Sequence, residues 1–279
     1  SKKITLATLE NGAMIGEMSY LEKKNPVASV KSITDLKLIA IKFQIISDQI
    51  ESNYELSKSF YKLISTKLCS QLLSQNKLIG YVHSNYDDSN EPLRKFISLF
   101  SSLDELDISW MSNIGKVISI DENNFLISQG EKLNYIYIVL SGRGDVFINE
   151  NDKDIMVGIS KRGELLGETS MLVSAQQNAT ASVRAKTQMD VLAISRNKLF
   201  SKIRDDSDFA TRFYKGIAIM LSQRSRDQLN SIGLNYLSNN LNQIEGNNNL
   251  NDELDFDLIS SISKASNRFD RLCNQLYST

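Results

Sequence analysis

Alternating apolar and polar positions occupy the middle of the chain. Between residues 117 and 195, short alternating runs are broken by Asp, Asn or Gly turn residues, and they read VISI, FLISQGE, YIYIVLSG, GDVFIN, IMVGIS and MDVLAI. A period of two is typical of β-strands, and regular turns between short strands indicate an antiparallel barrel or roll. We therefore expect a compact antiparallel roll, preceded by a short helix over 103–116.

The pattern changes to a helical period after residue 208. Apolar residues then recur on one helical face, at Phe209, Phe213, Ile217, Met220 and Leu221, which predicts a helix over 209–236. After an Asn-rich, acidic tether at 238–255, an apolar stripe with spacings of four and three predicts a second helix over 254–277. So short a helix cannot leave its stripe in water. We expect it to dock on this chain's own domains, the option that we favour, or on a partner.

The chain also contains an internal repeat. The matching segments are 3–21 with 154–172 and, after a two-residue shift, 28–41 with 181–194. In the first pair, Gly16 and Glu17 fall on Gly167 and Glu168, and the match continues into the helical region. A glycine-acid turn, two strands and an amphipathic helix do not align in this order by chance.

The repeat divides the chain into four parts. These are the C-terminal half of a first domain at 1–74, a linker or helix at 75–98, a complete domain at 99–237, and a tether with an amphipathic C-terminal helix at 238–279. The first copy corresponds to the second half of the roll, and half a roll would leave strand edges unpaired. Either the native polypeptide carries an earlier N-terminal part, which we favour, or another chain completes the roll. The expected fold class is α+β, mainly β, with tandem jelly-roll-like β-rolls, flanking helices and a C-terminal helix.

Composition limits the chemistry. With 32 basic and 33 acidic residues the net charge is −1, which argues against a dedicated binder of nucleic acid or anionic membranes. Cys69 and Cys273 have no partner at metal-ligand spacing, and His83 is the only histidine, so we expect buried thiols, no metal cluster and no enzyme activity. No apolar run reaches membrane-spanning length and no signal peptide opens the chain, so we expect a cytoplasmic protein without a membrane span.

Three spaced motifs carry a family resemblance. They are FLISQGE, YIYIVLSGRGDVFI and GELLGETSML, and they are followed by the helix at 209–229. In this order they resemble the cyclic-nucleotide-binding domain of catabolite-activator-type regulators, kinase regulatory subunits and gated channels. The resemblance covers about residues 100–230, with 3–73 as a partial copy, and it implies a β-roll whose last helix hinges over the ligand.

The resemblance also implies a site. A glycine lets a backbone turn approach the cyclic phosphate, a glutamate accepts from the ribose hydroxyl, and an arginine about ten positions later pairs with the phosphate. The candidate ligand-binding residues are Gly167, Glu168, Thr169 and Ser170 at the turn, Gln177 and Asn178 on the loop, and Gly16 and Glu17 in the first copy. The arginine position falls on Gln177, or on Gln176 or Asn178, and in the first copy on Pro26. Glu168 has a second interpretation, as a residue that caps the turn.

Two functions follow from these patterns. One is a non-catalytic regulatory scaffold with a degenerate phosphate site, which acts through protein–protein contacts or self-association of the helices at 209–236 and 254–277. The alternative is a sensor whose second domain binds cAMP or cGMP and moves its C-terminal helix. A transcription regulator is not expected for two reasons. Residues 234–279 are acidic, whereas a DNA-binding recognition helix is basic, and the Asn-rich tether leaves no room after it for a winged DNA-binding domain.

Overall fold

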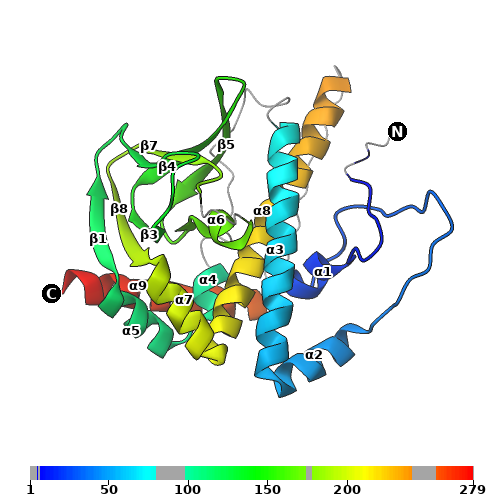
Figure 1. The fold of residues 1–279 in the computed structure, drawn as a ribbon, viewed down its shortest axis with the longest axis horizontal. Coiled ribbons are helices and arrows are strands. Elements are labelled where there is room, and N and C mark those ends of the chain that lie inside the picture. Colours follow the sequence, from blue (N-terminus) through cyan, green and yellow to red (C-terminus); the bar gives the residue numbers. More distant parts are fainter. Residues whose placement is uncertain (1–4, 6, 80–97, 174–177, 241–255, 279) are drawn as a thin grey trace.

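The computed structural model describes residues 5, 7–79, 98–173, 178–240 and 256–278. Its helices are α1 (Glu17–Glu22), α2 (Phe43–Ser52), α3 (Tyr54–Ile79), α4 (Ser98–Ser102), α5 (Glu105–Ile114), α6 (Glu168–Val173), α7 (Arg196–Asp205), α8 (Ser207–Asn240) and α9 (Phe256–Tyr277). Its strands are β1 (Lys116–Ile120), β2 (Phe125–Ile127), β3 (Tyr135–Ser141), β4 (Arg143–Glu150), β5 (Lys153–Lys161), β6 (Leu165–Leu166), β7 (Ser182–Ala185) and β8 (Met189–Ser195). The roll lies on one side of the molecule and the long helices α3 and α8 on the other (Figure 1).

The roll consists of two antiparallel four-stranded sheets. Their strand orders are β1-β8-β3-β6 and β2-β7-β4-β5. β8 pairs on one side with β1 and on the other with β3, and both of its faces are buried. Val191 packs with the apolar cluster inside the roll, whereas Leu192 and Ile194 join the cluster beneath the helices. The expected α+β class, with a β-roll and flanking helices, is confirmed.

The expectation of a mainly β chain is wrong, because helices make up about half of it. The strands expected in the first copy account for part of the difference. Residues 7–9 and the segment 28–41 form no strand. The roll of the second copy places β7 and β8 between other strands, and a backbone segment without such neighbours has nothing with which to form a sheet.

The helices of the two copies are nevertheless equivalent. α2 and α3 begin at residues 43 and 54, and α7 and α8 begin 153 residues later, at 196 and 207. Asn53 and Asp206 occupy the same place in this repeat, and each side chain accepts a hydrogen bond from the backbone N–H three residues ahead. Such caps satisfy one of the free N–H groups at a helix start. The repeat found in the sequence is therefore visible in the helical part of the structure.

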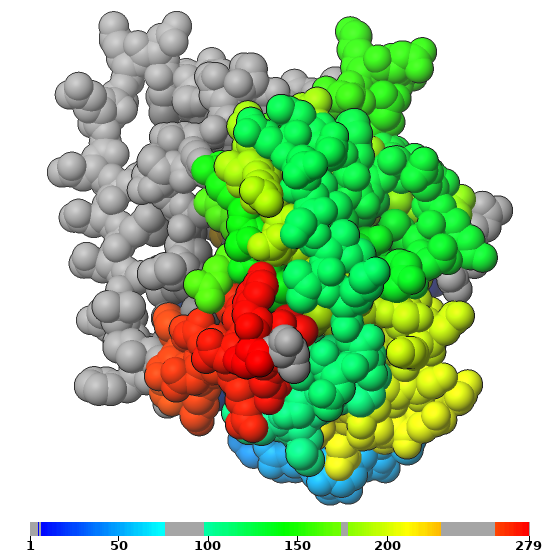
Figure 2. Space-filling model, turned by 90° about the vertical axis from the view of Figure 1, so that its left-hand side faces the viewer, coloured from blue at the N-terminus to red at the C-terminus, as the bar shows by residue number. Residues whose placement is uncertain are grey.

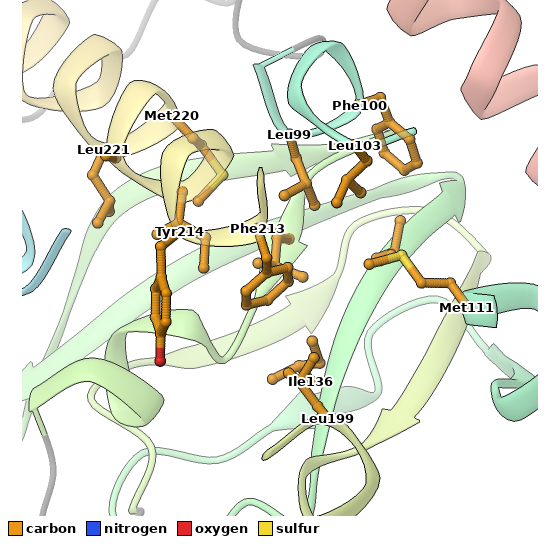
Figure 3. Packing of buried hydrophobic residues seen from close by; sticks show 14 of the residues in the cluster. Leu99, Phe100, Leu103, Met111, Ile136, Leu199, Phe213, Tyr214, Met220 and Leu221 are labelled. Carbon is orange, nitrogen blue, oxygen red and sulfur yellow. The ribbon is translucent and has the colours of Figure 1, made fainter. Parts of the chain in front are cut away.

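The helical core lies where α8 crosses α3, α4 and the roll. Phe213 of α8 lies between Leu99 of α4 and Ile136 of β3 (Figure 3). Gly216 permits the close crossing of α8 and α4, because a Cβ atom there would lie 3.0 Å from the Cα of Leu99. The helices of the first copy share this core, since Ile64 and Leu68 of α3 belong to the same apolar cluster.

The two C-terminal helices form as expected, with slightly different bounds. α8 extends to Asn240 and α9 covers residues 256–277. The apolar stripe of α9 packs on α4 and α5, where Phe269 meets Phe100 edge to face. Figure 2 shows α9 lying beneath the roll and beside the segment that contains α5. The stripe is thus covered by this chain's own helices, as favoured from its sequence.

Two of the expected connecting segments are only partly described. α3 continues to Ile79 and α4 begins at Ser98, so residues 80–97 of the expected linker lie outside the described residues, as do 241–255 of the tether. Among the helices that the structure describes, none has a run of apolar residues long enough to cross a bilayer.

Candidate ligand site in the β-roll

A cavity of about 130 Å³ lies between the roll, α3 and α8. Strand residues such as Ile127, Val146 and Val183 form its apolar wall, and Leu72 and Leu73 of α3 contribute to its lining. Its charged end is formed by Glu164, Glu168, Arg224 and Asp227. The cavity therefore combines an apolar interior with one strongly charged boundary.

Gly167 shapes the turn at this boundary. Its φ angle of +88° lies in the left-handed region, which glycine adopts without strain. A Cβ atom at this position would lie 3.4 Å from the Cδ1 of Leu133 and 3.5 Å from the carbonyl oxygen of Tyr135. The glycine thus lets the turn lie against the loop before β3, and α6 begins at the next residue, Glu168.

Arg224 of α8 closes the charged end of the cavity. Its guanidinium donates to Glu168 Oε1 at 2.6 Å and to Glu164 Oε2 at 3.2 Å, with a third bond to the carbonyl oxygen of Leu165 at 3.4 Å. Both carboxylates are buried. Glu168, the residue that maps to the ribose acceptor, is therefore paired with a cation of this chain.

The electrostatics of this cluster follow from burial and charge. Burial by itself would lower the pKa of Arg224, but the attraction of Glu168 and Glu164 outweighs it, so the pKa is raised and the guanidinium stays charged. Burial, and then the negative charge of Glu168, raises the pKa of the nearby Cys69 thiol to about 12. The thiol is accordingly protonated near neutral pH. The burial of Cys69 was expected from the sequence, whereas Cys273, for which burial was also expected, is partly exposed.

The other residues expected at the site have different surroundings. Thr169 lines the cavity, and its hydroxyl bonds that of Thr180 at 2.8 Å. Ser170 faces away from the cavity lining, because its hydroxyl accepts from Arg196 at 2.7 Å and donates to the carbonyl oxygen of Gly167. Asn178 forms an isolated β-bridge with Lys132 beside the site. Gln176 and Gln177 lie outside the described residues.

The first copy repeats the turn at a separate place. Gly16 has a φ angle of +93° and precedes the short helix α1, just as Gly167 precedes α6. Glu17 is buried and pairs with Lys67 of α3 at 2.7 Å. Neither Gly16 nor Glu17 lines the cavity in the second copy. In both copies, the glutamate after the glycine is thus neutralised by a helical cation of this chain.

The other arginines near the roll have different roles. The guanidinium of Arg184 lies 4.8 Å from the centre of the Phe147 ring, and Arg196 is buried beside Ser170. Within the described part of the cavity lining, Arg224 is the only lysine or arginine. The position of Arg143 is likewise away from this lining.

Arg224 is the functional residue that the sequence interpretation missed. It lies three residues after Leu221 and seven after Ile217, on the apolar face of the helix expected at 209–236. A single arginine on such a face indicates a buried partner, because an unpaired charge there is costly. That signal predicts an ion pair but not its partner, since Glu168 lies 56 residues away in the sequence.

Comparison with known proteins assigns this part of the chain. Residues 117–206 match the family model described as the cyclic nucleotide-binding domain. The chain therefore contains a cyclic nucleotide-binding domain, the module of regulatory proteins that its motifs resemble. No group of three or more His, Cys, Asp or Glu side chains that could hold a metal ion occurs in the described part of the chain.

Two curated relatives illustrate the similarity. A cGMP-dependent protein kinase of Caenorhabditis briggsae is 24% identical over 213 residues, which cover 75% of this chain and 24% of the kinase. The cAMP-activated global transcriptional regulator CRP of Salmonella typhimurium is 28% identical over 119 residues, 42% of this chain and 56% of the regulator. The chain thus spans about a quarter of the length of the kinase.

Solved structures include similar domains. A cyclic nucleotide-binding domain from Methylobacillus flagellatus superposes with a TM-score of 0.45 at 15% identity, over 55% of this chain and 86% of that one.

Proposed function

We propose that this chain is a non-catalytic regulatory protein whose nucleotide site is degenerate and is closed by its own Arg224. Its roll and helices then form a scaffold that acts through contacts with other proteins. The observation that carries this proposal is the pairing of Arg224 with Glu168 and Glu164 at the charged end of the cavity. This pairing engages Oε1 of the carboxylate to which a ribose hydroxyl would donate, and a nucleotide would have to share Glu168 with Arg224.

The size of the cavity supports the proposal. Small-molecule sites usually measure about 300–1,000 Å³, whereas this cavity measures about 130 Å³. The cavity would have to enlarge to admit a cyclic nucleotide, and an outward movement of α3 or α8, which contribute to its lining, would enlarge it. For α8, such a movement would separate Arg224 from two buried carboxylates.

The charges at the cavity also disfavour a cyclic phosphate. In the described part of the cavity lining the only lysine or arginine is Arg224, and its guanidinium is already paired with Glu168 and Glu164. A phosphate placed there would have to compete with these two buried carboxylates for Arg224. A phosphate arginine on the loop would change this balance, but the family position falls on Gln177.

Isothermal titration of the whole chain with cAMP and with cGMP tests this function. We expect no saturable heat up to about millimolar nucleotide, the range in which binding free energies fall to about −4 kcal/mol. The matched variant is Gln177→Arg, which adds the cation and should give measurable binding if the loop is mapped correctly. Saturable binding of either nucleotide to the unaltered chain at micromolar concentration would contradict the degenerate site.

A second candidate is a cAMP or cGMP sensor, and one observation favours it. The Gly167 turn keeps its left-handed backbone, and Arg224 lies on the helix that covers the site. A nucleotide whose ribose bonded Glu168 would displace Arg224 from this carboxylate and so remove a contact that holds α8 to the roll. Faster hydrogen exchange along α8 on addition of nucleotide, together with saturable heat, would support the sensor, whereas unchanged exchange without heat supports the scaffold.

A further inference from the structure

A row of apolar side chains is exposed between α1 and α2. Residues 28–41 leave the helical body as an extended loop on the side of the molecule opposite the roll (Figure 1). Its exposed members are Val30, Ile33, Leu36, Leu38, Ile39 and Ile41. Isolated exposed apolar residues are common on proteins, but six of them within twelve residues indicate a surface that another group covers.

The repeat shows what covers the equivalent residues. Val30, Leu38 and Ile39 correspond to Val183, Val191 and Leu192 of β7 and β8. The first-copy residues are 57%, 71% and 93% exposed, whereas their counterparts are 3%, 0% and 0% exposed. In the complete roll, β7 pairs with β2 and β4, and β8 pairs with β1 and β3. This pairing holds Val183 and Val191 in the apolar cluster inside the roll and Leu192 in the cluster beneath the helices.

The two ends of the segment have the same local structure as their counterparts in the complete roll. α1 follows its left-handed glycine as α6 does, and α2 begins at the residue equivalent to the start of α7. Ile50 of α2 and Ile64 of α3 lie in the helical core. Helices equivalent to those of the complete roll therefore flank 28–41 in the chain, and in the described part of the chain this segment has no neighbouring strands.

The segment is also basic. Residues 23–42 contain five lysines and one aspartate, so two copies of this segment laid side by side would bring like charges together. That charge disfavours a second copy of this chain as the occupant and favours an acidic one. Lysines along an edge also protect it from indiscriminate pairing.

We propose that residues 28–41 are a strand-addition surface, and that its partner is an acidic, antiparallel pair of β-strands with apolar side chains of the β3–β4 type. The pairing in the complete roll specifies the register. Ile136 and Ile138 of β3 oppose Ile194 and Leu192, and Val146 of β4 opposes Val183. In the partner, the corresponding apolar residues oppose Ile41, Ile39 and Val30. Backbone hydrogen bonds supply affinity in such an addition, and the alternate side chains supply register. This surface is separate from the Arg224 site, and it stands whether or not a nucleotide binds there.

A fusion tests the surface with the strands that pair with the equivalent segment, residues 181–194. Residues 116–161, which contain β1 to β5, are joined by a flexible linker ahead of residue 1 of the whole chain, because a linker gives the strands a high effective concentration. We expect amide hydrogen exchange in 28–41 to slow by more than about tenfold relative to the unfused chain. The fusion contains residues 116–161 twice, and either set can complete the roll of the second copy. The other set then remains available to pair with residues 28–41.

The control is the same fusion with Ile39→Asp. Ile39 is almost fully exposed in the unfused chain, so the substitution should leave the fold and the unfolding midpoint of that chain unchanged. In the fusion it places a charge in the new sheet, and the protection of 28–41 should be lost. Exchange in 28–41 that stays as fast in the fusion as in the unfused chain overturns the proposal. A dimer of the unfused chain that Ile39→Asp dissociates also overturns it, because a second copy would then be the occupant.

Discussion

Replacement of Arg224 should reveal how strongly α8 is held to the roll. Arg224→Met keeps the length and apolar stem of the side chain but removes the cation. Glu168 and Glu164, both buried, then lose the guanidinium that lies 2.6 Å and 3.2 Å away. Removal of one partner from a buried pair typically costs about 3–5 kcal/mol, because the other charge is left uncompensated. Since the Arg224 side chain is 20% exposed, water reduces the loss, and we expect about 3 kcal/mol, at the lower end of that range.

Urea denaturation measures this loss as a lower transition midpoint with an unchanged slope. A second substitution, Glu168→Gln, separates the charge effect from lost packing. In the Arg224→Met background it removes one of the two uncompensated charges, so it should restore part of the stability, whereas in the unaltered chain it should destabilise. The exposed Arg204 provides the matched control, because Arg204→Met removes only surface contacts, those with Asp205 and Ser201, and should leave the transition midpoint almost unchanged. A loss below about 1 kcal/mol for Arg224→Met, with additive effects of the two substitutions, would refute the role of the Arg224 ion pairs in holding α8 to the roll.

Three further substitutions or reactions test other parts of the structure. Asp206→Ala should lower the free energy of unfolding by about 0.5–2 kcal/mol in urea denaturation, because Phe209 loses its cap; Asp206→Asn should cost less, and equal losses would contradict the cap. Despite its partial burial, Asp206 has a lowered pKa because Lys202 and the Phe209 backbone N–H donate to its carboxylate. The stability that this carboxylate contributes is therefore present above its unfolded pKa and is lost as the pH falls through its folded pKa. In a pH series of denaturation curves, the difference in unfolding free energy between Asp206→Asn and the unaltered chain should shrink in acid. Gly216→Val should cost about 1–3 kcal/mol in thermal unfolding, because its side chain would press on the α4 backbone. Cys69 should resist iodoacetamide at pH 8 in the folded chain and react after denaturation, as mass spectrometry would show, since burial raises its pKa to about 12; rapid labelling of the native protein would contradict its burial.

Local patterns were sufficient for much of the architecture. The period of two over 117–195 predicted the roll, and the helical periods predicted α8 and α9. Side chains that face the core recur every second residue in a strand and every three to four residues in a helix, so such elements can be recognised from the sequence alone. The repeat likewise predicted a second glycine turn, and Gly16 and Gly167 share nearly the same backbone angle.

The candidate site was predicted only in part. Gly167, Glu168 and Thr169 lie at the cavity, because they belong to one turn that the motif marks. Their partners come from distant segments: Arg224 from α8, and Leu72 and Leu73 from α3. No local spacing relates these residues to the turn. Ser170, which was also expected at the site, instead accepts a hydrogen bond from a distant residue, Arg196.

The sequence by itself determined which segments can form strands, helices and turns, because those depend on neighbours a few positions away. Only the tertiary structure decided which of them find partners. Residues 28–41 and 181–194 have nearly the same pattern, yet only the second forms strands, since a strand needs hydrogen-bonding neighbours that its own residues do not contain. In the same way, Glu168 appeared in the sequence as a ribose acceptor, and the packing of α8 made it the partner of Arg224.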